Sequence, residues 1–278
     1  MKFYKFSEIV LLILFLAGVA LVTNFDFFKK IIASILNIFD AENAIKINKH
    51  LAINPQKGVY STVWTARSKY FNDLIRIADE TEINSMVIDV KDSGVYIDDY
   101  LKNLVEELQK KNIYTIARLV IFQDSSQIKY HPDWYFKKEG GALWVDNRGW
   151  YWMDPSNREV WEYNLSAAKK AIDTGFDEIN FDYIRFPAFA KIDDVDLSVL
   201  ASAGKPAQRY AKNKVINDFA YFLTSELKKY NPEIVLSIDL FAYNMFKTDD
   251  LGVGQKFIEL YDYFDYVSPM IYPSHYLP

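Results

Sequence analysis

The segment EINFDYIRFP, residues 178–187, places charged side chains in a stretch that otherwise has the pattern of a buried strand. A buried charge is costly unless it is paired or used, so the segment holds either a structural ion pair or a functional group. Strand periodicity puts Asn180 and Asp182 on one face. We interpret Asp182 as a functional carboxylate and Glu178, at the start of the strand, as structural.

A second carboxylate, Asp239, lies in the apolar segment EIVLSIDLFAY. Glycoside hydrolysis requires one carboxylate as nucleophile or base and another as proton donor. Neighbouring parallel strands lie about 4.8 Å apart, so two carboxylates at one edge could approach the roughly 5–5.5 Å of retaining enzymes. Arg185 would favour the ionised form of Asp182, whereas Asp239 would need a raised pKa to act as the acid. We predict Asp182 and Asp239 as the catalytic pair.

Further polar side chains fall at the outgoing ends of several predicted strands, the edge where the loops of a parallel barrel assemble the site. Each has a structural alternative, and Asp89 with Lys91 could form an internal ion pair. The residues predicted to bind substrate at this edge are Asp89, Lys91, Arg118, Arg185, Tyr243 and Tyr272.

The long segment 123–157 has no regular pattern and is rich in Trp, Asp and Gly. On a loop at the mouth of a barrel, Trp144 and Trp152 would form stacking platforms for sugar rings. The alternative is that they cover the barrel as a hydrophobic lid.

Strands and helices alternate along the rest of the chain. Near-continuous apolar strands alternating with amphipathic helices predict an α/β fold with a parallel sheet. An open doubly wound sheet is possible, but the first strand is followed by TARSKY rather than by a glycine-rich phosphate loop. We therefore predict a (β/α)8 TIM-type barrel, truncated after about six β/α units because the chain stops at Pro278 straight after the sixth strand. The expected strands are 58–66, 83–92, 113–122, 176–187, 233–243 and 265–273, and the expected helices are 68–81, 98–112, 158–175, 207–231 and 253–264.

The first 24 residues carry Lys2 and Lys5 and then an apolar run from Ile9 to Val22. This pattern is typical of an uncleaved signal anchor or of a cleaved signal peptide, and we favour the anchor. Either one places the remainder outside the cytoplasm. We expect a membrane-proximal helix and linker over 25–56 and the barrel over 57–278.

Composition excludes several classes of protein. The net charge of −5 and the lack of a long basic run argue against a nucleic-acid partner. The absence of cysteine excludes thiolate metal sites and a cysteine nucleophile. The three histidines are scattered, so we expect neither a metal nor another cofactor. Aromatic residues form 17% of the chain and supply core area or stacking faces for sugars.

Four ordered motifs carry a family resemblance: VIDVKDSG, the segment 152–163 around DPSNREVW, FDEINFDYIRFP, and SPMIYPSHY. They resemble the DUF4015 family of glycoside-hydrolase-like domains, which is distantly related to the α-amylase-like barrels. The resemblance implies a TIM-type barrel that acts on a polysaccharide.

In amylase-like enzymes the fourth strand carries the nucleophilic aspartate, which matches Asp182, and the fifth carries a glutamate acid, for which Asp239 is the nearest match. The arginine that precedes their nucleophile by two residues is Asn180 here. The last motif contains Tyr272 and His275, and we predict that His275 also binds substrate.

Three hypotheses follow. The first is an anchored glycoside hydrolase acting on a cell-wall or capsular polysaccharide, and the second is a carbohydrate-binding barrel without catalysis. The third, a metal-dependent deacetylase, would require histidine ligands, and only His131 and His275 lie in the predicted barrel.

Overall fold

The computed structural model describes residues 55–138, 140–187 and 205–272, with side chains from residue 212 onward in the last range. The chain divides into two units at Pro55–Gln56, and every helix and strand below lies in the second. The predicted anchor, almost all of the linker and His275 lie outside the described residues. Within those ranges no helix combines the length and the apolar character needed to cross a bilayer.

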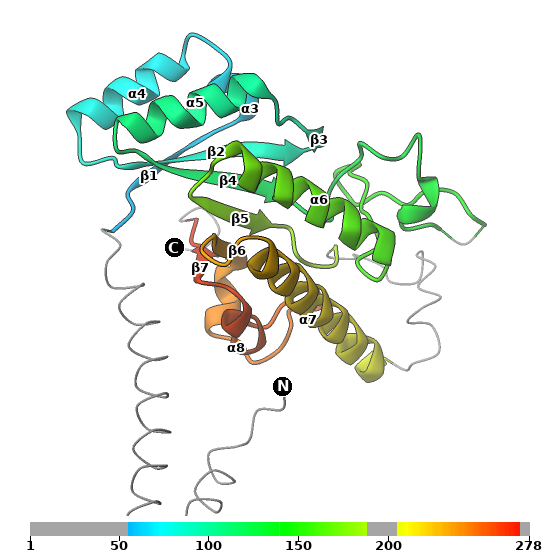
Figure 1. Cartoon of the computed structure of the whole chain (residues 1–278). Coiled ribbons are helices and arrows are strands. Elements are labelled where there is room, and N and C mark those ends of the chain that lie inside the picture. The colour runs from blue at the N-terminus through cyan, green and yellow to red at the C-terminus, as the bar shows by residue number, and fades with distance from the viewer. Residues whose placement is uncertain (1–54, 139, 188–204, 273–278) are drawn as a thin grey trace, which may run out of the picture. The chain divides into compact units, whose positions relative to one another are not determined.

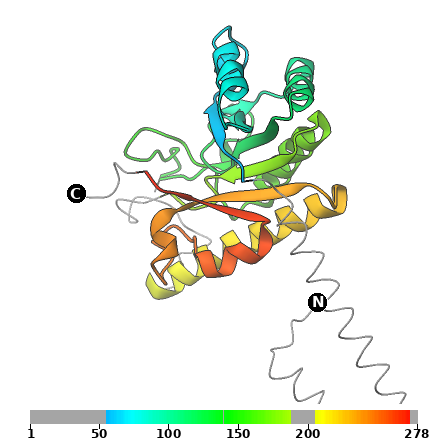
Figure 2. The same ribbon diagram turned by 90° about the vertical axis from the view of Figure 1, so that its left-hand side faces the viewer.

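The fold is built on a sheet of six parallel strands in the order β1-β2-β4-β5-β6-β7, with the short β3 pairing antiparallel with β2 (Figure 1). Every strand therefore lies beside its predecessor among the parallel strands, as in a barrel wall. β1 and β7 form the two edges of this half-barrel (Figure 2). The strands are β1 (Gly58–Ser61), β2 (Ser85–Asp92), β3 (Gly94–Val95), β4 (Tyr114–Val120), β5 (Glu178–Asp182), β6 (Val235–Phe241) and β7 (Tyr266–Met270).

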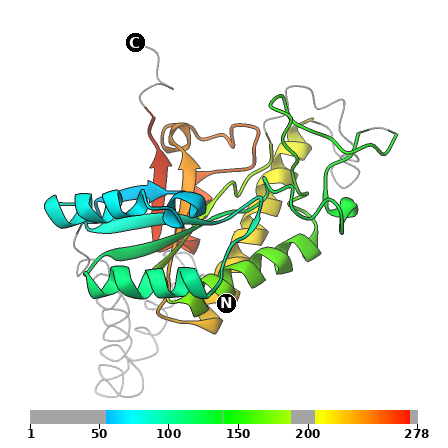
Figure 3. The same ribbon diagram turned by 90° about the horizontal axis from the view of Figure 1, so that it is seen from above.

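Helices cover one face of this sheet (Figure 3). Helix α6 packs against β5 and lies between α5 and α7. The α-helices are α3 (Val63–Ala66), α4 (Phe71–Glu80), α5 (Asp99–Lys110), α6 (Arg158–Thr174), α7 (Lys205–Tyr230) and α8 (Phe257–Leu260). The 3-10 helices are η1 (Pro132–Trp134), η3 (Ala242–Met245) and η4 (Tyr261–Tyr263).

Local capping explains where two of the predicted helices begin and end. The side chain of Asp98 accepts a hydrogen bond from the Leu101 N–H at 3.1 Å, which starts α5. The Asn157 side chain accepts from the Glu159 N–H at 2.8 Å at the start of α6. Gly175 ends α6 with a φ of 101°, a left-handed conformation that glycine adopts without steric cost.

The two faces of the sheet differ in chemistry because side chains alternate along each strand. On the helix-covered face, Phe181, Ile238 and Leu240 are fully buried in the apolar core. On the opposite, inner face, β4, β5 and β6 present Arg118, Asn180, Asp182, Ser237 and Asp239. The apolar face stabilises the fold by packing against the helices, and the polar face carries the candidate site.

The predicted α/β architecture with six parallel strands in barrel order is therefore confirmed. Some boundaries were wrong for local reasons. The first strand stops at Ser61 because the Thr62 side chain caps α3, accepting from the Thr65 N–H at 3.1 Å. The helix expected over 253–264 is shorter and continues as η4.

Candidate active site

Arg118, on the inner face of β4, is the centre of a cluster of carboxylates. Its guanidinium forms ion pairs with Asp89 on β2, at 2.6 Å, and with Asp182 on β5. Its Nε lies 3.9 Å from a carboxylate oxygen of Asp239 on β6. The Tyr60 hydroxyl on β1 donates to the other oxygen of Asp89. Four strands therefore contribute side chains that converge on one guanidinium.

Asp182 is the last residue of β5, and the backbone turns sharply behind it. The Tyr183 N–H donates to Asp182 Oδ1 at 2.6 Å, while Arg118 holds Oδ2. Tyr183 has a φ of 58°, which is uncommon for a bulky side chain, and such strained residues cluster at functional sites. The carboxylate of Asp182 is thus fixed at both oxygens at the outgoing end of its strand.

Asp239 occupies the matching place on β6. Phe181 and Ile238 are register partners, so the next residues, Asp182 and Asp239, are neighbours on adjacent strands. Burial and the nearby Asp182 carboxylate raise the pKa of Asp239 to about 7, against the opposing hydrogen bond from Asn180 and the charge of Arg118. The Asn180 side chain donates to Asp239 Oδ1 at 3.0 Å. The raised pKa that an acid at this position requires is therefore a property of the folded chain.

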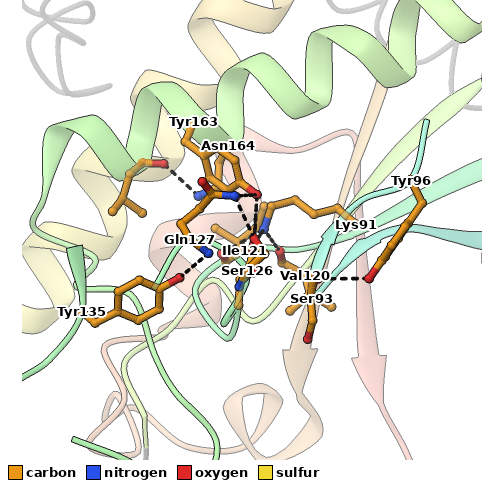
Figure 4. Close-up of polar contacts among 12 residues, drawn as sticks. Lys91, Ser93, Tyr96, Val120, Ile121, Ser126, Gln127, Tyr135, Tyr163 and Asn164 are labelled. Atoms are coloured by element: carbon orange, nitrogen blue, oxygen red, sulfur yellow. Dashed lines mark hydrogen bonds and ion pairs between the residues drawn. The ribbon is translucent and has the colours of Figure 1, made fainter. Parts of the chain in front are cut away.

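The structure places Lys91 away from this cluster. A bulge in β2 pairs Asp89 with Arg118 but Lys91 with Leu119, so Lys91 turns to the helix-covered face. There its amine lies 2.8 Å from an Asp124 carboxylate oxygen and donates to the Val120 carbonyl at 2.5 Å, with both charged side chains fully buried. Figure 4 shows Lys91 directed toward the loop that follows β4, with Tyr163 of α6 beside it.

Lys91 therefore pairs with Asp124 and Asp89 with Arg118, rather than with each other. Burial lowers the pKa of the Lys91 amine, and the Asp124 carboxylate opposes this. The two pairs serve different purposes. The Lys91 pair anchors the loop after β4 beneath α6, whereas the Arg118 pair lies within the carboxylate cluster.

Arg185 also differs from expectation, because the ion-pair partner of Asp182 is Arg118. The Arg185 guanidinium lies among three aromatic rings, with its Cζ 4.7, 5.0 and 4.8 Å from the ring centroids of Trp152, Tyr183 and Phe241. Its Nη1 donates to the Phe186 carbonyl at 3.1 Å. Arg185 nevertheless lines the cavity next to Asp182.

The aromatic segment 123–157 divides between the two predicted roles. Trp144 is buried and packs edge-on against Phe136, which is the lid role. Trp152 is also buried, but it lines the cavity, and its Nε1 donates to Asp146 Oδ2 at 3.0 Å. Trp150, which is 46% exposed, is the most exposed tryptophan of this segment.

Two cavities flank the carboxylates. One, of about 410 Å³, lies over the outgoing ends of β4 and β5 and is lined by Arg118, Gln123, Asp146, Arg148, Trp152, Asp182, Arg185 and Tyr272, among others. The other, of about 490 Å³, lies along the inner face and is lined by Tyr60, Glu178, Asn180, Asp182, Asp239 and Tyr272, among others. Arg118, Asp182 and Tyr272 line both, so the Asp182 carboxylate lies where the two spaces meet, whereas Asp239 lines only the second.

Tyr272, which we predict to bind substrate, lines both cavities. Tyr243 is half exposed in η3 and lines neither cavity. Within the described ranges, no group of three or more His, Asp or Glu side chains is arranged to hold a metal ion.

Sequence reasoning missed Tyr60, and it interpreted Glu178 as a structural residue. Tyr60 lies on the first strand, at the register position of Val87, and only the tertiary fold brings it to Asp89. Glu178 shares the face of Asp182 and accepts from Ser237 at 2.5 Å and from Tyr114 at 3.2 Å. Burial raises the pKa of Glu178. Glu178 and Asp182 are an even number of residues apart on one strand, and this spacing indicates that they share a face.

Enzymes built on parallel α/β barrels carry their active sites at the outgoing ends of the strands, and glycoside hydrolysis uses a pair of carboxylates. The half-barrel described here has carboxylates at that edge. The family model for DUF4015, described as "Putative glycosyl hydrolase domain", matches residues 58–278. The chain belongs to this family. A search of curated proteins finds no match.

Solved structures with a TM-score above 0.5 show the same fold. A hypothetical protein from Ruminiclostridium thermocellum is 30% identical, with a TM-score of 0.55, over 65% of this chain and 96% of that one. A β-galactosidase from Bacillus circulans sp. alkalophilus is 15% identical, with a TM-score of 0.59, over 80% of this chain and 41% of its own. An α-galactosidase from Lactobacillus brevis is 15% identical, with a TM-score of 0.47, over 66% and 27% respectively. The chain thus spans less than half the length of either galactosidase.

Proposed function

We propose that the protein hydrolyses O-glycosidic bonds of a polysaccharide, with Asp182 as nucleophile and Asp239 as general acid and base. The observation that carries this proposal is the different electrostatic setting of two neighbouring carboxylates. Asp182 is ion-paired with Arg118, whereas the pKa of Asp239 is raised to about 7. Environments that separate two titratable groups in this way assign the acid and the nucleophile in glycosidases.

The reaction would proceed in two steps. The Asp182 carboxylate attacks the anomeric carbon and forms a glycosyl ester, while Asp239 gives its proton to the departing glycosidic oxygen. In the second step Asp239, now a carboxylate, takes a proton from a water molecule. The oxygen of that water attacks the anomeric carbon and releases Asp182. Both steps invert the configuration, so the product retains it.

The register supports retention over inversion. Asp182 and Asp239 directly follow paired residues of adjacent strands, and parallel strands lie about 4.8 Å apart. This spacing is close to the roughly 5–5.5 Å between carboxyl groups in retaining enzymes and shorter than the 6.5–9.5 Å of inverting ones. Arg118 would position Asp182, and Trp152 and Tyr272 would contact the sugar.

The test is hydrolysis of a panel of cell-wall and capsular glycans by the full chain, followed as release of reducing ends. Asp182→Asn and Asp239→Asn should each lower the rate by at least 100-fold, whereas Asp79→Asn, an exposed surface change, should leave it unchanged. Glycan binding that survives both substitutions, with no turnover by the wild type, would instead support a carbohydrate-binding barrel.

We also propose that the protein acts on the extracytoplasmic face of a membrane. Support comes from the sequence of residues 1–24, with Lys2 and Lys5 before the apolar run. Protease treatment of intact cells should degrade the domain, and full protection of the domain in intact cells would contradict this topology.

A further inference from the structure

The cavity over the outgoing ends of β4 and β5 has an excess of hydrogen-bond donors over free acceptors. Its carboxylates are already engaged. Asp146 accepts from the Arg148 and Trp150 N–H groups and from Trp152 Nε1. Asp182 accepts from Tyr183 N–H and from Arg118. Both lining carboxylates therefore already accept hydrogen bonds from the protein itself.

The donors of the same cavity are largely unused. A guanidinium has five N–H donors, and Arg185 uses one, toward the Phe186 carbonyl. Among the residues that the structure describes, no carboxylate forms an ion pair with Arg185 or Arg148. The side chains of Gln123 and Asn147, which also line the cavity, donate to no described residue.

The charges agree with this count. The lining contains three arginines. Arg118 is already paired with Asp89 and Asp182, so the cations without a carboxylate partner among the described residues are Arg148 and Arg185. Burial lowers the pKa of Arg185, because desolvation of its charge is only partly offset by neighbours. The three rings around Arg185 hold its guanidinium in place beside Asp182, so the orientation that a ligand requires exists before binding.

We propose that this cavity binds an anionic substituent of the sugar, so that the substrate is an acidic polysaccharide with Arg185 and Arg148 as its specificity-determining residues. A planar carboxylate such as that of a uronic acid matches the fork of a guanidinium through two parallel hydrogen bonds. The assignment of a substrate class rests on the proposed hydrolase function, because only a hydrolase has a substrate to select. The anion site itself rests only on the geometry above.

Binding of matched oligosaccharides to the full chain tests the proposal. The probes are an oligogalacturonate and the neutral oligogalactoside of equal length, with inorganic phosphate as a third arm. The measurements use Asp239→Asn to prevent turnover, with calorimetry and intrinsic tryptophan fluorescence as readouts. The acidic probe should bind at least tenfold more tightly than the neutral one, and its binding should weaken as salt rises. Competition by phosphate at similar concentration would show that the site takes oxyanions in general.

Substitutions assign the effect to the two arginines. Arg185→Gln should weaken the acidic probe about 10- to 100-fold, the range for hydrogen bonds to charged groups, and leave the neutral probe within twofold. Arg148→Gln, at an exposed position, should weaken the acidic probe several-fold without affecting folding. Arg76→Gln, a control on α4 whose partners are exposed carboxylates, should change nothing.

Two results would overturn the proposal: equal binding of both probes, or an equal loss of both in Arg185→Gln, which would make Arg185 a packing residue. If Arg185→Gln does not fold, equal binding of the acidic probe by Arg148→Gln and the wild type would also overturn it. Selective acidic binding without hydrolysis of any glycan would refute the hydrolase function and leave the anion site standing. Hydrolysis of neutral glycans alone, at a rate that Arg185→Gln does not change, would refute the anion site and support the hydrolase function.

Discussion

Replacement of Asp239 by asparagine should remove activity and at the same time stabilise the fold at alkaline pH. The pKa of Asp239 is raised by burial and by Asp182 from an ordinary 3.8 to about 7. A group whose pKa is raised on folding favours the folded chain when protonated and opposes it when ionised. Asparagine is neutral at every pH, and its oxygen can still accept the hydrogen bond that Asn180 donates.

The size of the effect follows from the same values. At 1.36 kcal/mol per pKa unit, ionised Asp239 costs the fold about 4 kcal/mol above pH 7. At pH 5 the folded chain keeps the proton, and the cost falls to less than half of this value. The stability of Asp239→Asn relative to the wild type should therefore rise by about 3 kcal/mol between pH 5 and pH 8.

Urea unfolding of the full chain, followed by tryptophan fluorescence at several pH values, measures this difference. Asp79→Asn, an exposed surface substitution, is the matched control and should show no such pH dependence. If Asp239→Asn is no more stable than the wild type at pH 8, or if their difference does not change with pH, Asp239 is not held in its protonated form. It could not then serve as the acid.

Three further predictions follow from the same contacts. The value of kcat/KM should fall about tenfold per pH unit above pH 7 as Asp239 loses its proton, and a profile that stays flat to pH 9 would exclude Asp239 as the acid. Lys91→Met should lower the free energy of unfolding by about 3–5 kcal/mol because it leaves Asp124 buried without its partner. Lys111→Met, at an exposed ion pair, should lower it by no more than about 1 kcal/mol. Equal effects of the two substitutions in denaturant titrations would refute the role of the buried pair. Arg118→Lys should keep the fold but lower kcat more than it raises KM, because an ammonium cannot span two carboxylates as a guanidinium does; wild-type kcat would contradict the positioning role.

Much of the fold followed from patterns that are local in sequence. The six parallel strands were predictable because apolar runs alternate with helices whose starts carry capping residues such as Asp98 and Asn157. The convergence of Asp89, Arg118, Asp182 and Asp239 was predictable in outline, since parallel strands bring their outgoing ends to one edge.

The details that failed depend on tertiary geometry. Period-two spacing places Lys91 on the face of Asp89, but the bulge between them reverses it. Arg185 is close to Asp182 in sequence, whereas Arg118 reaches Asp182 from the neighbouring strand. The raised pKa of Asp239 arises from burial and from Asp182, neither of which can be calculated from sequence spacing.

The most direct test of the central claim is a search for the glycosyl ester on Asp182. The full chain would be mixed with a glycan that it hydrolyses. The reaction would be quenched in acid within milliseconds, and the protein would then be digested for mass spectrometry. We predict a sugar adduct on the peptide that contains Asp182, and this adduct should be more abundant in Asp239→Asn when the leaving group is a good one. Efficient hydrolysis with no adduct on Asp182, or with an adduct on another residue, would contradict the assignment of Asp182 as the nucleophile.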